Sequence, residues 1–127
     1  MTKTEKYKEL YAQVKSVVDG ETDAVANMAN VAALVHEAFG FWWTGFYIVK
    51  GEELVLGPFQ GPVACTRIPF GKGVCGSAWK RQESIVVPIF EDGIVKGVLD
   101  IDSKELATFD ETDREWLERT VELVKVI

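Results

Sequence analysis

The spacing of apolar residues divides the first third of the chain into two helical stretches. Over residues 4–18 the apolar positions follow the i, i+3, i+4, i+7 pattern of an amphipathic helix: Tyr7, Leu10, Tyr11, Val14, Val17 and Val18. A second stretch with this periodicity predicts a helix from a cap at Thr22 or Asp23 to about Phe39. Gly20 and Gly40 follow the two stretches, as is typical of helix C-terminal stops.

After Gly40 the pattern changes to aromatic and β-branched runs separated by turn residues. Residues 41–49 and 53–56 predict two strands joined by a tight turn. Further strands are expected at 63–69, 84–90 and 94–101, with a short helix at 77–82 and a last helix capped by Thr108, with Glu111 at the capping-box position. The sum is an α+β domain, with N-terminal helices and a C-terminal helix packed on an antiparallel sheet of about five or six strands.

Composition narrows the classes of partner and compartment. The 127 residues fit a single domain, 1–127. A net charge of −6 argues against nucleic acid, because phosphate binding draws on clustered Lys and Arg. We find no apolar run long enough to span a membrane and no signal-peptide core, so a cytoplasmic location is expected. One histidine, His36, is more typical of an ordinary helix residue than of a metal ligand, so no metal site is expected.

The two cysteines are the first candidates for chemistry. Cys75 lies in the glycine-punctuated stretch 71–76 at the start of the expected short helix, where the helix dipole would stabilise a thiolate. The alternative, a small buried hydrophobe, is the commoner role of a free cysteine. The stretch also matches G-x-G-x-x-G, but the helix after it is too short for a nucleotide-binding crossover. Cys65 precedes Cys75 by ten positions, and whether the two reach disulfide distance stays open.

Two further patterns place side chains on one face of a strand. Asp100 and Asp102 are two positions apart, so they share a face, where they form either an exposed strand end or a clamp for an ammonium group. Trp43 and Tyr47 are four apart and also share a face, where they form either ordinary core or an aromatic wall for an alkyl or cationic ligand. The opposite face of that strand is expected to carry Trp42, Thr44 and Phe46.

In this order the segments resemble one family. The blocks are WTGFY at 43–47, LVLGPFQG at 54–61, ACTRIP at 64–69, GKGVCG at 71–76, IVVPI at 85–89 and GVLDID at 97–102. Together they are similar to the free methionine-(R)-sulfoxide reductases, which are stand-alone GAF domains. The resemblance spans nearly the whole chain, and its LGPFQG and GKGVCG blocks are characteristic of that family.

The resemblance implies a reaction that uses no metal or organic cofactor. A cysteine thiolate attacks the sulfur of free L-methionine-(R)-sulfoxide, methionine leaves, and a sulfenic acid remains. A second cysteine converts the sulfenic acid to a disulfide, which thioredoxin reduces. A homodimer is compatible with the sequence.

The resemblance also implies roles for individual residues. Cys65 and Cys75 match two of the family's three cysteines, in resolving or supporting roles. The aromatic wall is assigned to Trp43 and Tyr47, and the ammonium-binding acids are Asp100 and Asp102. Glu83 is either a further substrate-binding acid or part of the segment that the family has before its long loop.

The chain departs from the family at one place. A loop that should follow the GVCG segment and carry the attacking cysteine, in a His-Ile-Ala-Cys block, is missing around 82–88. Three interpretations are open: the loop is present in the protein but disordered and absent from this sequence, the loop was removed deliberately or lost in evolution, or Cys75 has taken over the attack. The alternative functions are a non-catalytic GAF module that binds a small molecule and an interaction domain with exposed tryptophans.

Overall fold

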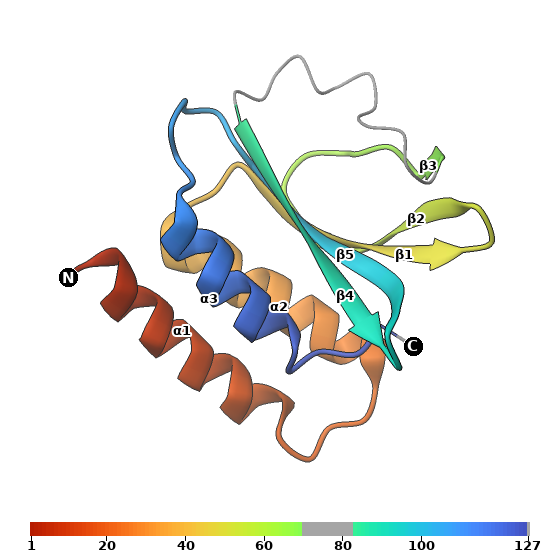
Figure 1. Cartoon of the computed structure of the whole chain (residues 1–127), viewed down its shortest axis with the longest axis horizontal. Coiled ribbons are helices and arrows are strands. Elements are labelled where there is room, and N and C mark those ends of the chain that lie inside the picture. Colours follow the sequence, from red (N-terminus) through yellow and green to blue (C-terminus); the bar gives the residue numbers. More distant parts are fainter. Residues whose placement is uncertain (70–82, 127) are drawn as a thin grey trace.

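The computed structural model describes residues 1–69 and 83–126 (Figure 1). Each helix in these ranges begins at a residue whose side chain caps it. Helix α1 (Lys3–Val18) starts with a capping box between Thr2 and Glu5. Helix α2 (Ala24–Phe39) is capped by Asp23 and ends at Gly40, whose φ of 65° suits glycine. Both elements confirm the prediction from apolar spacing.

The cap of α3 (Glu111–Val121) differs from the predicted one. Asp110, and not Thr108, is the N-cap, and Asp113 completes the capping box. The Thr108 hydroxyl instead lies 2.7 Å from the Ser103 hydroxyl and donates to the Glu105 carbonyl. Because that hydroxyl is engaged within its own loop, the stronger carboxylate cap two residues later begins the helix.

Five antiparallel strands form one sheet in the order β3-β2-β1-β5-β4. Their bounds are Trp43–Lys50 for β1, Glu53–Gln60 for β2, Arg67–Pro69 for β3, Glu83–Glu91 for β4 and Ile94–Ser103 for β5. The predicted strand at 63–69 is thus confined to its last three residues. The predicted short helix at 77–82 and Cys75 lie outside the described residues. The α+β class and the antiparallel sheet are confirmed.

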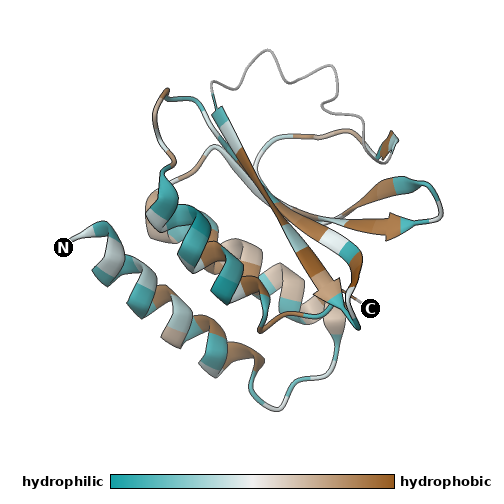
Figure 2. Ribbon diagram, in the orientation of Figure 1, coloured by the Kyte–Doolittle hydropathy of each residue, from teal (hydrophilic) through white to brown (hydrophobic). Residues whose placement is uncertain are grey.

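Helices α1, α2 and α3 lie on the same side of the sheet (Figure 1). Helices α2 and α3 contact the strands, and α1 packs across both helices as an outer layer. The principal core fills the space between sheet and helices, and its largest fully buried side chains include Tyr7, Leu10, Met28, Phe46, Leu99 and Leu117. Figure 2 shows apolar residues along the central strands and mostly hydrophilic residues on α3. A second, smaller cluster of buried residues lies on the other face of the sheet.

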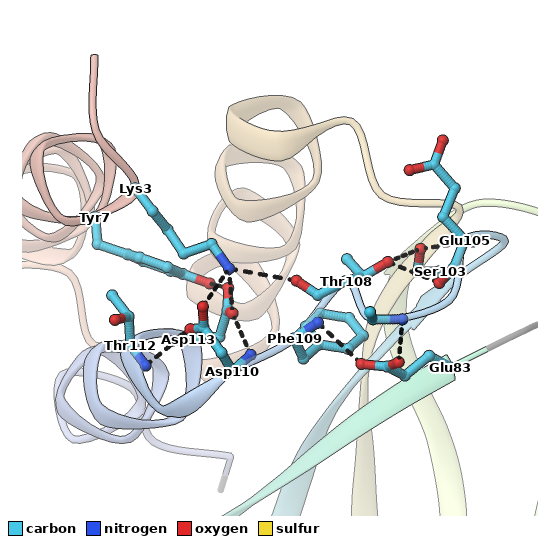
Figure 3. Close-up of polar contacts among 11 residues, drawn as sticks. Lys3, Tyr7, Glu83, Ser103, Glu105, Thr108, Phe109, Asp110, Thr112 and Asp113 are labelled. Atoms are coloured by element: carbon cyan, nitrogen blue, oxygen red, sulfur yellow. Dashed lines mark hydrogen bonds and ion pairs between the residues drawn. The ribbon is translucent and has the colours of Figure 1, made fainter.

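A network of polar side chains joins α1 to the start of α3 (Figure 3). The Tyr7 hydroxyl donates to Asp113, and Lys3 Nζ lies 2.7 Å from the same carboxylate. Burial, together with the adjacent carboxylate, raises the pKa of Tyr7 far above its ordinary value, so the hydroxyl stays protonated as a donor. The network fixes the loop that follows β5 from the helix side.

Candidate functional site

The predicted acids and the predicted aromatic wall come together on the sheet face that points away from the helices. Strands β1 and β5 are adjacent, and their register pairs Trp43 with Asp102, Gly45 with Asp100 and Tyr47 with Val98. Cross-strand partners carry their side chains on the same face of a sheet. The structure therefore places a pair of carboxylates directly beside a pair of aromatic rings on two central strands.

The aromatic wall has three rings, of which the sequence identified two. The ring centroids of Trp43 and Tyr47 are 6.0 Å apart, and those of Trp43 and Phe59 are 5.2 Å apart. Phe59 belongs to β2 and pairs with Gly45, so it reaches the Trp43 ring from the neighbouring strand. Trp43 and Tyr47 are each only 3% exposed, so a ligand would meet the edge of this stack rather than an open surface.

Trp42 does not occupy the predicted position. Strand β1 begins one residue later, at Trp43, so Trp42 falls outside the alternation that buries Thr44 and Phe46 under the helices. Its backbone N–H donates to the Asp102 carbonyl at 3.1 Å, and its ring packs against the Trp43 cluster. Lys104 Nζ lies 5.5 Å from the centre of the same ring. Trp42 therefore borders the site instead of joining the main core.

Glycine at position 45 allows the Trp43 ring to lie flat on the sheet. A Cβ placed on Gly45 would come within 2.4 Å of Phe59 Cβ and 2.5 Å of Trp43 Cη2. Contacts this short force neighbouring atoms to move. The stack of Trp43 and Phe59 over this position thus depends on the missing side chain.

We expect Gly45→Ala to lower the free energy of unfolding by about 2 kcal/mol or more, because the added methyl overpacks the stack. Urea denaturation followed by tryptophan fluorescence measures this change. Gly57→Ala, also in a strand, is the matched control. A Cβ there meets its nearest neighbours at 3.1 Å and 3.3 Å, and we expect a smaller loss. Equal stability of the two variants would contradict the role given to Gly45.

The loop 61–66 carries Cys65 and is held by the polar atoms of the aromatic wall. Trp43 Nε1 donates to the Pro62 carbonyl at 2.9 Å, and the Tyr47 hydroxyl donates to the Cys65 carbonyl at 2.8 Å. Cys65 is half-buried. Cys75 lies outside the described residues, so the distance between the two cysteines stays open.

Asp100 and Asp102 differ in burial. Asp102 is 7% exposed, whereas Asp100 keeps an intermediate exposure. Two carboxylates on one face are a group that can accept hydrogen bonds from an ammonium ligand. On the outer side, Ser84 of β4 pairs with Asp102 and therefore shares this face. No pattern in the sequence identifies Ser84, because only the strand register brings it beside the acids.

Glu83 does not join the acid pair. It pairs with Ser103, so its side chain lies on the helix-facing side of the sheet, opposite to Asp102. Both carboxylate oxygens are engaged there, since they accept from the backbone N–H groups of Ala107 at 2.7 Å and Phe109 at 2.9 Å (Figure 3). The structure therefore does not support the prediction of Glu83 as a substrate-binding acid, and shows it holding the loop before α3.

His36 is the helix residue that the sequence predicted. Its Nδ1 lies 3.0 Å from the Thr44 hydroxyl, and burial lowers the pKa of His36 below its ordinary value. Within residues 1–69 and 83–126, no group of three or more His, Cys, Asp or Glu side chains is arranged to hold a metal ion. None of the helices in those ranges combines the length and apolar character required to cross a membrane.

Comparisons with known proteins agree with this architecture. No family model matches the chain. A curated relative from Dictyostelium discoideum, GAF domain-containing protein A, is 40% identical and is aligned over 97% of this chain and 92% of its own length. The free methionine-R-sulfoxide reductase of Escherichia coli is 37% identical, over 100% of this chain and 92% of its own. A solved free methionine-R-sulfoxide reductase from Neisseria meningitidis, in complex with its substrate, is 48% identical with a TM-score of 0.90, over 97% of this chain and 88% of that chain.

These similarities show, first, that the chain has the fold of GAF domains. Within that class, it belongs to the free methionine-R-sulfoxide reductase family, whose members are oxidoreductases. The alignment with the E. coli enzyme extends over 151 positions although this chain contributes 127 residues, a difference of 24. The E. coli relative therefore has at least 24 residues that align with no residue of this chain.

Proposed function

We propose that the outer face of β1 and β5 binds free L-methionine-(R)-sulfoxide. The ammonium group lies between Asp100 and Asp102, and the methyl-sulfoxide end lies against Trp43 and Tyr47. The observation that carries this proposal is the register of the two strands, which sets the acids directly beside the aromatic residues.

The shape of the ligand fits this arrangement. Four single bonds separate the amine nitrogen of methionine sulfoxide from its sulfur, a reach comparable to the spacing of about 4.8 Å between neighbouring strands. The free amino acid carries the ammonium charge, whereas a methionine inside a polypeptide has an amide in its place. A carboxylate binds an ammonium group through charge-assisted hydrogen bonds that an amide does not form, so the site favours the free amino acid.

The chemistry we propose is that of cysteine thiols, without a metal or organic cofactor. An attacking thiolate takes the oxygen of the sulfoxide, a proton is taken up, and methionine and a cysteine sulfenic acid result. A second thiol then displaces water to form a disulfide, and the dithiol of thioredoxin reduces that disulfide. Cys65 and Cys75 are proposed for the resolving or supporting roles in this sequence.

The attacking cysteine is the part of the machinery that the 127-residue chain lacks. The 24 additional positions in the alignment with the E. coli enzyme support an absent segment of the length of a loop. We place this gap around 82–88, next to the start of β4. The chain as printed should therefore bind the substrate and turn it over little or not at all.

Calorimetric titration tests the binding proposal without requiring turnover. We expect free L-methionine-(R)-sulfoxide to bind at least about 50-fold more tightly than its N-acetyl derivative, because acetylation removes the ammonium charge that meets the acids. The two ligands carry the same sulfoxide, so the acetylated one is the matched control. Equal affinities for both would contradict the assignment of Asp100 and Asp102.

A second candidate function follows from the same gap. Without an attacking cysteine, the domain would act as a non-catalytic GAF module that binds a small amino acid. The intact mass of the protein isolated from its source separates the two, since a mass well above 14.2 kDa shows an additional segment. If the mass agrees with the printed chain and no turnover is found with thioredoxin, the binding module is the better description.

A further inference from the structure

The polar atoms of Trp43 and Tyr47 bind the loop that carries Cys65. The Trp43 indole N–H and the Tyr47 hydroxyl both donate to backbone carbonyls of the loop 61–66, at 2.9 Å and 2.8 Å. The second of these carbonyls belongs to Cys65 itself. Buried indole N–H and phenol O–H groups usually find a hydrogen-bond partner, and here both partners lie in the loop that carries Cys65.

The rest of the loop is fixed to the same part of the sheet. At its far end the Leu56 N–H donates to the Thr66 carbonyl at 2.9 Å, just before β3 pairs with β2. At its near end Gly61 has a φ of 127°, and a Cβ there would lie 2.7 Å from Trp43 Cδ1. The loop therefore packs closely on the Trp43 ring, and the two side-chain bonds fix the backbone between its ends.

We propose that Trp43 and Tyr47 are positioning residues for Cys65. Their rings form the wall of the site while their polar atoms hold the backbone of the cysteine, so the thiol keeps a fixed place relative to that wall. The catalytic meaning of this link rests on the proposed function, but the link itself does not. Ligand contact with the rings and the position of the Cys65 thiol are thus coupled through two hydrogen bonds.

The reactivity of the Cys65 thiol tests this link. In a Cys75→Ser background, Cys65 is the sole thiol of the 127-residue chain, and its alkylation by iodoacetamide is followed by mass spectrometry. We expect Tyr47→Phe to change the alkylation rate about five-fold, toward faster reaction, because the bond that restrains the backbone is lost. Trp43→Phe, which removes the bond to Pro62, should change the rate in the same direction.

The control must separate local release from a general loss of stability. Thr2→Ala removes the N-cap of α1, with an expected cost similar to that of one buried hydrogen bond, and lies far from the loop. We expect Thr2→Ala to leave the alkylation rate unchanged. An unchanged rate in both Tyr47→Phe and Trp43→Phe would overturn the proposal, as would an equal increase in Thr2→Ala. The assay uses no substrate, so it tests the link between the two side chains and Cys65 even if the protein does not bind methionine sulfoxide.

Discussion

Insertion of a loop with the family's His-Ile-Ala-Cys block between Gln82 and Glu83 should raise turnover of free L-methionine-(R)-sulfoxide by about 10³-fold or more. The reason is that the reaction needs a thiolate at the sulfoxide sulfur, and removal of a nucleophile from an enzyme costs several orders of magnitude in rate. The insertion point directly precedes β4. The first residue of this strand, Glu83, accepts hydrogen bonds from the backbone N–H groups of Ala107 and Phe109. Turnover is measured as NADPH oxidation coupled through thioredoxin and its reductase.

The control for this experiment is the same insertion with its cysteine replaced by serine. We expect that variant to remain at the level of the 127-residue chain, because it restores the length of the loop but not the thiol. Rapid turnover by the chain without any insertion would contradict the account. It would instead favour an attack by Cys75.

The second large effect concerns the acid pair. Replacement of both Asp100 and Asp102 by asparagine should weaken binding of free L-methionine-(R)-sulfoxide by about 100-fold, because two charge-assisted hydrogen bonds to the ammonium are lost. The expected loss comes from the charges, since asparagine has nearly the shape of aspartate. Calorimetry on the folded variant gives the change in Kd.

Asp92→Asn provides the matched charge control for that measurement. Asp92 lies in the β4–β5 turn with a φ of 54°, a backbone conformation that asparagine adopts readily. We expect this variant to keep the affinity of the unmodified protein. The role of the acids would be refuted by a double variant that still binds as tightly as Asp92→Asn does.

Local periodicity and turn chemistry predicted the elements that depend on local interactions. The apolar spacing in α1 and α2 defines the helix faces that the core buries. The turns of both hairpins contain residues with positive φ, among them Gly51 and Gly93, where glycine is the favoured residue. The same-face placement of the acids and of Trp43 with Tyr47 followed from the two-residue repeat of strands.

The features that the sequence missed depend on contacts between distant segments. Glu83 and Ser84 are neighbours in the chain, yet the pairing of β4 with β5 sends only Ser84 to the acid face. The contact of Phe59 with Trp43 needs β2 beside β1, and it needs Gly45 because a Cβ there would collide with both side chains. The choice of Asp110 over Thr108 as a cap depends on the hydrogen bond that occupies Thr108. No pattern within a single segment contains this information.

A crystal structure of the protein soaked with free L-methionine-(R)-sulfoxide would show whether the outer face of β1 and β5 holds this ligand. We expect the ammonium nitrogen within about 3 Å of carboxylate oxygens of both Asp100 and Asp102, with the methyl-sulfoxide end against Trp43 and Tyr47. A ligand bound on another surface, or with its ammonium group turned away from both acids, would contradict this expectation.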